Sequence, residues 1–182
     1  DADETEFLLE EQMWKSSKSS LPLVLLKDPA WRDVSSREHS TELQFKAAEA
    51  ESMGRAAKGV KAIQLNPGDT VVCASLAGAG NEILLLTDKG YVKRVLAVDI
   101  PVQARAGKGG KAFSFTRNGS NGTRIQAAYL VDQPFDLLIG QKSGIETTVN
   151  TAAVAIEGLN STGKMATLVM MDDEITKVVK IP

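Results

Sequence analysis

From Asp69 to the end of the chain, short apolar runs alternate with groups of turn-forming residues. The runs have the length of β-strands and cover residues 70–74, 83–87, 91–96, 111–115, 125–131, 137–140, 146–149, 164–170 and 175–181. Glycine, asparagine, aspartate and serine gather between them, at residues 77–81, 88–90, 118–122 and 141–144. Strands of this length at intervals of about 8–12 residues are typical of all-β sandwiches, barrels and propellers. The pattern therefore predicts an all-β fold.

The pattern also repeats along the chain. The stretch from Gly54 to Ile63 and the stretch from Ala104 to Phe113 share Arg, Ala, Lys, Gly, Lys and Ala in register. The hairpin at residues 84–93 has a counterpart at 138–147, and the Gly-Lys pair at 110–111 has one at 163–164. A period of about fifty residues is typical of propeller blades and similar repeated modules. We predict a propeller-like repeat of four-stranded blades. The first unit ends near residue 75, the second covers residues 82–131 and the third covers residues 135–182.

The beginning of the chain fits this repeat poorly. Residues 4–15 have the apolar and acidic pattern of an amphipathic helix, residues 16–20 are a serine-rich linker, and residues 21–28 have the pattern of an opening strand. We therefore assign residues 1–42 to an acidic N-terminal segment with a partial blade, and residues 43–182 to the repeated blades.

Charge is unevenly distributed along the chain. The net charge is only −2. Residues 1–51 carry six basic and twelve acidic side chains, residues 52–126 carry eleven and four, and residues 127–182 carry four and seven. Binding of a polyanion depends on the local field and not on the total charge. The middle of the chain is therefore a candidate surface for a polyanion such as duplex DNA.

The repeated basic stretches supply the candidate DNA contacts. Glycines let the backbone approach the ligand closely, and duplex DNA carries one negative charge per ~1.7 Å of its axis, so that a binding surface needs cations at intervals. Such contacts position DNA without reading its sequence. The candidate DNA-binding residues are Arg55, Lys58, Lys61, Lys93, Arg94, Arg105, Lys108, Lys111, Arg117 and Arg124.

Two other interpretations remain open. The glycines can be ordinary turns at strand ends, with lysines that only keep the surface soluble. The chain can also be a small β-repeat scaffold that binds a protein through its basic stretch and does not bind DNA.

Enzymatic and metal chemistry find little support in the sequence. His39 is the single histidine, so a zinc site or a Ser-His-Asp triad would depend on it alone. The single cysteine, Cys73, lies in an apolar run and is expected in the core. We predict no catalytic residue, no metal ligand and no cofactor in this chain.

One segment resembles a nucleotide-binding loop. Residues 158–164 match the phosphate-loop pattern through Lys164, but Met165 stands where Ser or Thr must bind magnesium. The residues that follow have a strand pattern where such a loop needs a helix. A third interpretation, a nucleotide enzyme, therefore rests on a motif that fails.

Localisation is predicted from missing signals. The first residues lack a basic region followed by an apolar core, and no apolar run approaches the ~20 residues that cross a bilayer. We expect a cytoplasmic protein.

Three segments together resemble a known family. They begin at Arg55, with Arg-Ala-Ala-Lys-Gly-Val-Lys-Ala-Ile-Gln-Leu, at Ile83, with Ile-Leu-Leu-Leu-Thr-Asp-Lys-Gly-Tyr-Val-Lys-Arg, and at Arg124, with Arg-Ile-Gln-Ala-Ala-Tyr. They resemble the C-terminal domain of the A subunit of bacterial type IIA topoisomerases, gyrase and topoisomerase IV. The resemblance covers the chain from about Leu43 to its end.

The resemblance implies a β-pinwheel of five or six blades whose basic rim bends and wraps duplex DNA. Gyrase carries a box with the sequence Gln-Arg-Arg-Gly-Gly-Lys-Gly, and a degenerate version stands here at Gln103, Ala104, Arg105, Ala106, Gly107, Lys108 and Gly109. The departures at Ala104 and Ala106 favour topoisomerase IV over gyrase. About three units are present where the family has five or six.

The resemblance also implies partners. They are the ATPase partner subunit, duplex DNA and the remainder of the A subunit, with a location at the nucleoid. ATP, magnesium and the catalytic tyrosine would belong to other parts of the enzyme, so this chain alone is expected to have no strand-cleaving activity.

Overall fold

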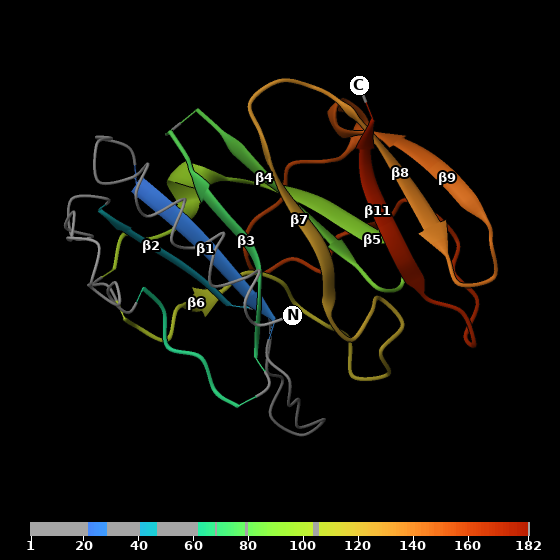
Figure 1. Ribbon diagram of the computed structural model, residues 1–182, viewed down its shortest axis with the longest axis horizontal. Helices are drawn as coiled ribbons and strands as arrows, with labels where there is room; N and C mark the ends of the chain where they lie inside the picture. Colours follow the sequence, from blue (N-terminus) through green and yellow to red (C-terminus); the bar gives the residue numbers. More distant parts are fainter. Residues whose placement is uncertain are drawn as a thin grey trace, which may run out of the picture.

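The computed structural model describes residues 22–28, 41–46, 62–67, 69–78, 80–103 and 106–181, the first two ranges as backbone only. These residues form antiparallel strands and two short 3-10 turns, Ala97–Asp99 and Thr151–Ala153. The strands make three sheets that follow one another across the molecule (Figure 1). The prediction of an all-β, blade-like repeat is confirmed. The predicted helix at residues 4–15 lies outside the described residues.

The first sheet contains four strands, in the order β3 (Thr70–Leu76), β1 (Pro22–Asp28), β2 (Thr41–Lys46) and β6 (Gly110–Lys111). The strand predicted at residues 21–28 is therefore present and lies inside this sheet. It pairs with β2, which spans the expected boundary at residue 42, and with β3, which lies beyond that boundary. The first blade is built from both regions.

The second and third sheets follow the same plan. The second has the order β10 (Lys164–Met165), β5 (Tyr91–Leu96), β4 (Glu82–Thr87) and β7 (Ile125–Val131). The third has the order β11 (Ile175–Ile181), β8 (Asp136–Gln141) and β9 (Glu146–Asn150).

Each of the second and third units adds a short strand to the sheet of the unit before it. β6 belongs by sequence to the second unit but pairs with β2 of the first sheet, Lys111 opposite Thr41. β10 belongs to the third unit but pairs with β5 of the second sheet, Met165 opposite Tyr91. Each added strand crosses a unit boundary predicted from the sequence and thereby links two neighbouring units.

Two apolar layers fill the spaces on either side of the second sheet. Alternate residues of β4 point to opposite faces: Ile83 and Leu85 enter the layer that includes Phe113, whereas Leu84 and Leu86 enter the layer with Leu137. All four β4 side chains are at most 2% exposed. Burial on both faces explains why this strand reads as a continuous apolar run.

Two predicted strands are much shorter than expected. The run at 111–115 forms a strand only at Gly110–Lys111, and the run at 164–170 only at Lys164–Met165. In the first run, Ala112 and Phe113 are fully buried in an apolar layer and do not continue the ladder. These residues are apolar because they pack between sheets. In the sequence, such residues give the same kind of apolar run as a buried strand.

Within the described ranges, the structure contains no helix of the length and apolar character that a membrane span requires.

Candidate nucleic-acid interface

The fold brings the two repeated basic stretches together. The end of the first stretch lies beside the middle of the second, because the Ala106 amide donates to the Ala62 carbonyl at 2.8 Å and the Gln64 amide donates to the Gly107 carbonyl at 2.9 Å. The stretches are fifty residues apart in sequence. Backbone pairing thus joins the end of the first stretch to the second stretch, at Ala106 and Gly107.

The backbone of the second stretch turns sharply where these bonds form. Ala106 has φ 63° and Gly109 has φ 85°, in the left-handed region that non-glycine residues rarely adopt. The segment then enters β6, where Gly110 pairs with Glu42 of β2. Hydrogen bonds on both sides of the turn hold the loop, so that Lys108 projects from a fixed backbone.

The side chains of the box-like motif differ in exposure. Lys108 is exposed, whereas Gln103, Gly107 and Gly109 are half-buried. Lys111 is half-buried and engaged in an interaction of its own. The remaining candidates of the two stretches, Arg55, Lys58, Lys61, Ala104 and Arg105, lie outside the described residues.

Lys93 is a correction to the predicted surface. Its side chain is fully buried, and its ammonium donates to the carbonyls of Gly158 and Leu159 at 2.9 Å each and of Ser161 at 3.2 Å. The ammonium also lies 4.9 Å from the centre of the Phe113 ring. Lys93 therefore fastens a loop of the third unit and does not offer its charge to a phosphate.

Arg94 is engaged in the same junction. Its guanidinium contacts the Glu82 carboxylate at 2.5 Å and donates to the Val154 carbonyl at 2.8 Å, with the Arg94 side chain only 15% exposed. The Arg94 amide also donates to the Ala155 carbonyl. Most of its donor capacity is used within the protein, which leaves little for DNA.

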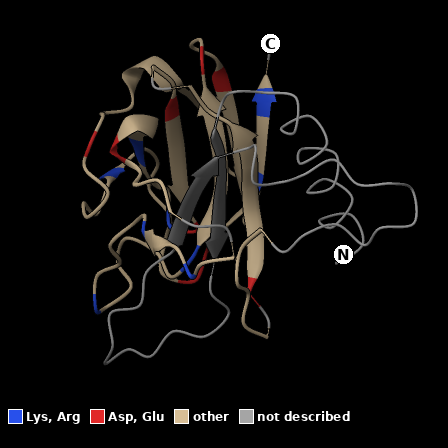
Figure 2. Ribbon diagram, turned by 90° about the vertical axis from the view of Figure 1, so that its left-hand side faces the viewer, with Lys and Arg blue, Asp and Glu red and all other residues tan. Residues whose placement is uncertain are grey.

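The two remaining candidates lie near the surface. Arg117 is exposed in the loop after Phe115. Arg124 is 44% exposed and pairs with Glu174 at 3.0 Å. A surface ion pair contributes about 0–1 kcal/mol, so the arginine could exchange this carboxylate for a phosphate at small cost. Along the ribbon, basic residues stand on loops and on strands, interspersed with acidic ones (Figure 2).

Sequence reasoning missed the residues that hold the Arg124 loop. Asp88 is buried and accepts from the Thr123 amide at 2.8 Å and from the Thr123 hydroxyl at 2.7 Å. A Cβ on Gly122, which has φ +114°, would lie 2.6 Å from an Asp88 carboxylate oxygen. The Asp-Lys-Gly turn signalled a hairpin, and nothing in the sequence signalled the loop that folds onto it.

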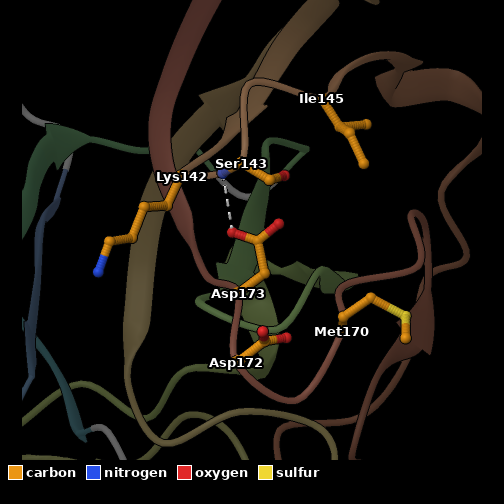
Figure 3. Close-up of a pocket in the computed structure, with 6 residues that line it drawn as sticks. All are labelled: Lys142, Ser143, Ile145, Met170, Asp172 and Asp173. Atoms are coloured by element: carbon orange, nitrogen blue, oxygen red, sulfur yellow. Dashed lines mark hydrogen bonds between the residues drawn. The ribbon is translucent and has the colours of Figure 1, made fainter.

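A hollow lies between the hairpin that leads into β9 and the turn before β11. It has a volume of about 290 Å³ and is lined by Lys142, Ser143, Ile145, Met170, Asp172 and Asp173 (Figure 3). The Ser143 amide donates to an Asp173 carboxylate oxygen at 3.1 Å. Hydrogen bonding to Ser143, more than any other influence, lowers the pKa of Asp173. This carboxylate fastens the hairpin.

Reactive groups are few in the part of the chain that the structure describes. No three His, Cys, Asp or Glu side chains there gather in a way that could hold a metal ion. Burial raises the pKa of the Cys73 thiol to about 11, so the thiol stays protonated and unreactive at neutral pH.

Comparison with known proteins places this geometry in context. Residues 43–74 and 81–121 match the family model described as DNA gyrase C-terminal domain, beta-propeller. The A subunit of DNA gyrase from Fibrobacter succinogenes is 33% identical over 129 residues, which is 69% of this chain and 14% of that protein. The A subunit of DNA gyrase from Staphylococcus aureus is 30% identical over 145 residues, 79% of this chain and 16% of that protein.

Solved structures agree at the level of the fold. The C-terminal domain of DNA topoisomerase IV superimposes with a TM-score of 0.70 and 18% identity, covering 89% of this chain and 47% of that domain. The DNA gyrase A C-terminal domain gives a TM-score of 0.68 at 18% identity, covering 90% of this chain and 52% of that domain. The chain thus spans about half of these domains and about one seventh of the curated relatives.

Proposed function

This chain belongs to the family of DNA gyrase C-terminal β-propeller domains, and from that premise we propose that it binds duplex DNA without sequence specificity and bends or wraps it for a type IIA topoisomerase. The domain would act as part of the enzyme's A subunit. Strand cleavage and ATP hydrolysis, with their magnesium, would take place in other parts of the enzyme, at the nucleoid and together with the ATPase partner subunit.

The pairing of the two basic stretches carries this proposal. Two direct backbone hydrogen bonds join residues 62–64 to residues 106–107, so cations from two units can face the same stretch of DNA. Adjacent sites that bind one rigid polyanion gain affinity because the second contact is made within the complex. This pairing sets the end of the first basic stretch against the loop that contains the exposed Lys108.

The energy of bending sets how many contacts are needed. Bending 20–30 base pairs by 40–90° costs on the order of 1–6 kcal/mol, which several phosphate contacts must offset. With Lys93 buried, the proposed contacts are Arg55, Lys58, Lys61, Arg105, Lys108, Lys111, Arg117 and Arg124. Arg94 contributes only if DNA displaces its partner Glu82.

The choice between gyrase and topoisomerase IV rests on the sequence of the box-like motif. Ala104 and Ala106 replace residues of the gyrase box, and we propose topoisomerase IV on that ground. The relatives compared above are gyrase A subunits, and the solved neighbours include both enzymes. Supercoiling by an enzyme that contains this chain would decide for gyrase.

The proposal is tested by measuring the affinity of the chain for a duplex of ~40 base pairs across salt concentrations. A slope of log affinity against log salt near −4 or steeper would indicate four or more neutralised phosphates, at about 0.9 per contact. The variant Lys108→Glu should weaken binding and make the slope shallower by about one. Lys93→Met should keep the wild-type slope in protein that is folded.

Lys142→Glu is the matched control. It makes the same charge change at an exposed position in the hairpin of the third unit, away from the paired stretches. If Lys142→Glu and Lys108→Glu weaken binding equally, the paired stretches are not the DNA site. If the chain fails to bind duplex at low salt, DNA binding is refuted, and the protein-interaction scaffold becomes the better explanation.

A further inference from the structure

Two Asn-Gly pairs stand three residues apart in the loop that leads into β7, at Asn118-Gly119 and at Asn121-Gly122. The loop projects beyond the end of β7 (Figure 1). In such a pair, the backbone nitrogen of the glycine can attack the carbonyl carbon of the asparagine side chain, because glycine has no side chain to obstruct the attack. The two pairs therefore share one chemistry, and the fold decides which of them reacts.

The Asn121 side chain is locked inside the loop. Its nitrogen donates to the carbonyls of Ser114 at 2.8 Å and Thr162 at 3.0 Å. Its oxygen accepts from the Thr116 amide at 2.8 Å and from the Thr116 hydroxyl at 3.0 Å. Asn121 is only 1% exposed. Both polar atoms of this side chain are thus held in place, away from the water that the reaction consumes.

The glycine of the second pair is enclosed as well. A Cβ on Gly122 would lie 2.6 Å from a carboxylate oxygen of Asp88. The Gly122 amide donates to the Gly119 carbonyl at 3.0 Å. Attack on the Asn121 side chain would require this backbone to move against Asp88, which holds the adjacent Thr123 by two hydrogen bonds.

Asn118, in contrast, is exposed in the same loop. Space surrounds Gly119, where an added Cβ would meet only a methyl group of Thr123, at 3.5 Å. The Ser120 amide donates to the Asn118 side-chain oxygen at 3.2 Å. This hydrogen bond polarises the side-chain carbonyl and stabilises the negative charge that develops on its oxygen during attack. The first pair is therefore accessible and activated.

One hydrogen bond opposes the reaction at the first pair. The Gly119 amide donates to the Thr116 carbonyl at 2.9 Å, and the nitrogen must leave this bond before it attacks. The bond lies in an exposed part of the loop, where local opening takes little free energy. Opening at Asn121 would instead break the four hydrogen bonds of its side chain.

We propose that Asn118 is a deamidation site of the folded protein, converted to aspartate or isoaspartate while Asn121 stays intact. Solvent base removes the proton of the Gly119 amide, and the nitrogen bonds to the side-chain carbonyl carbon of Asn118. The bond from this carbon to the side-chain nitrogen breaks, and that nitrogen leaves as ammonia with a proton from solvent. Water then opens the cyclic imide at either carbonyl. The net reaction consumes one water, releases one ammonia and involves no oxidation.

The product places a negative charge beside a proposed DNA contact. A carboxylate is ionised at neutral pH, whereas the amide that it replaces is neutral. Arg117 is exposed next to Asn118 along the chain, and Arg124, at the end of the loop, is 44% exposed. The deamidated chain should bind duplex DNA more weakly, because the carboxylate repels phosphate. This consequence rests on the proposed function, whereas the chemistry at Asn118 does not.

The reaction is followed by incubating the folded chain under mildly alkaline conditions and digesting samples with trypsin. Cleavage after Arg117 and Arg124 releases both pairs in one peptide, residues 118–124. Fragmentation in the mass spectrometer locates the replacement of NH₂ by OH at either asparagine, and digestion in water labelled with ¹⁸O marks any deamidation that occurs during digestion. We expect Asn118 to react at least about tenfold faster than Asn121 in folded protein, and the two to react at similar rates in urea.

Two results would overturn the assignment. If Asn118 stayed intact in the folded protein but reacted in urea, the turn that holds the Gly119 amide would be protecting it. If both asparagines reacted at equal rates in the folded protein, the hydrogen bonds of the Asn121 side chain would give no protection.

Protein variants test the effect on DNA separately. Asn118→Asp carries the charge of the product and should weaken duplex binding by roughly three- to tenfold at moderate salt, while Asn118→Ser should bind like the wild type. Gln133→Glu makes the same change from amide to carboxylate at an exposed residue beyond the opposite end of β7, and it should leave the affinity unchanged.

The two parts of the proposal fail in distinguishable ways. Equal affinities of Asn118→Asp and Gln133→Glu would overturn the effect on DNA, and an intact Asn118 in folded protein would overturn the modification. A chain that binds no duplex at all would refute the proposed function, and mass spectrometry would still decide whether Asn118 is modified.

Discussion

Replacing Lys93 with methionine tests the claim that a buried lysine holds the second and third units together. Methionine keeps most of the unbranched stem but removes the ammonium, leaving the carbonyls of Gly158, Leu159 and Ser161 without these three hydrogen bonds. Each buried group that loses its partner costs about 1–3 kcal/mol. The variant is spared the cost of burying a charge, which offsets part of the loss. We expect a net destabilisation of about 3 kcal/mol.

Urea unfolding followed by circular dichroism measures this effect. A loss of about 3 kcal/mol in a chain of this size should also lower Tm by roughly 6–12 °C. Lys164→Met is the matched control, because Lys164 is exposed on β10, and its effect should stay within about 0.5 kcal/mol. If Lys93→Met were as stable as Lys164→Met, the buried ammonium would contribute nothing net, and its role in joining the units would be refuted.

Three more predictions concern single positions. Gly122→Ala should lower the free energy of unfolding by about 2–4 kcal/mol in thermal unfolding, because the added Cβ meets Thr87 at 2.7 Å. Gly144→Ala is the control, with positive φ but open space around the added Cβ, and should cost about 1 kcal/mol. Equal losses would refute the steric argument. With a folded-state pKa of about 11, Cys73 should react with iodoacetamide at pH 8 more than about a hundredfold slower than in urea. Rapid labelling of folded protein would contradict the raised pKa. Asp173 has a lowered folded-state pKa, so its carboxylate stabilises the fold above the unfolded pKa, and this contribution is lost as pH falls through the folded pKa. The difference in stability between wild type and Asp173→Asn should therefore shrink below about pH 4. A constant difference would refute the assignment.

Strand positions were well predicted where a strand lies within a complete ladder. The predicted strands at 91–96, 125–131 and 175–181 have the observed bounds, because apolar runs ended by turn residues have few alternatives. The runs at 111–115 and 164–170 were predicted too long. Phe113 is apolar because it packs between two sheets, and a one-dimensional pattern does not distinguish this burial from that of a strand.

The basic site was predicted only in part for a related reason. Lysine and arginine read as surface charge in a sequence, since they are seldom buried without partners. Lys93 can be buried because the carbonyls of Gly158, Leu159 and Ser161 accept hydrogen bonds from its ammonium. These partners lie more than sixty positions away along the chain. Lys108 carries the same charge in a glycine-rich loop and is exposed, whereas Lys93 lies inside the strand Tyr91–Leu96. The sequence does not show the distant carbonyls that allow a lysine on that strand to be buried.

The sequence by itself determined the all-β class, the repeat of about fifty residues and the family, because alternation of apolar runs with turns and the likeness between units are properties of neighbouring residues. Only the tertiary structure decided how the units interlock. The addition of β6 and β10 to sheets of the preceding units and the pairing of residues 62–64 with 106–107 are contacts between distant segments. Such contacts depend on how sheets stack and on which backbone groups remain unpaired, which emerges once the whole chain is folded.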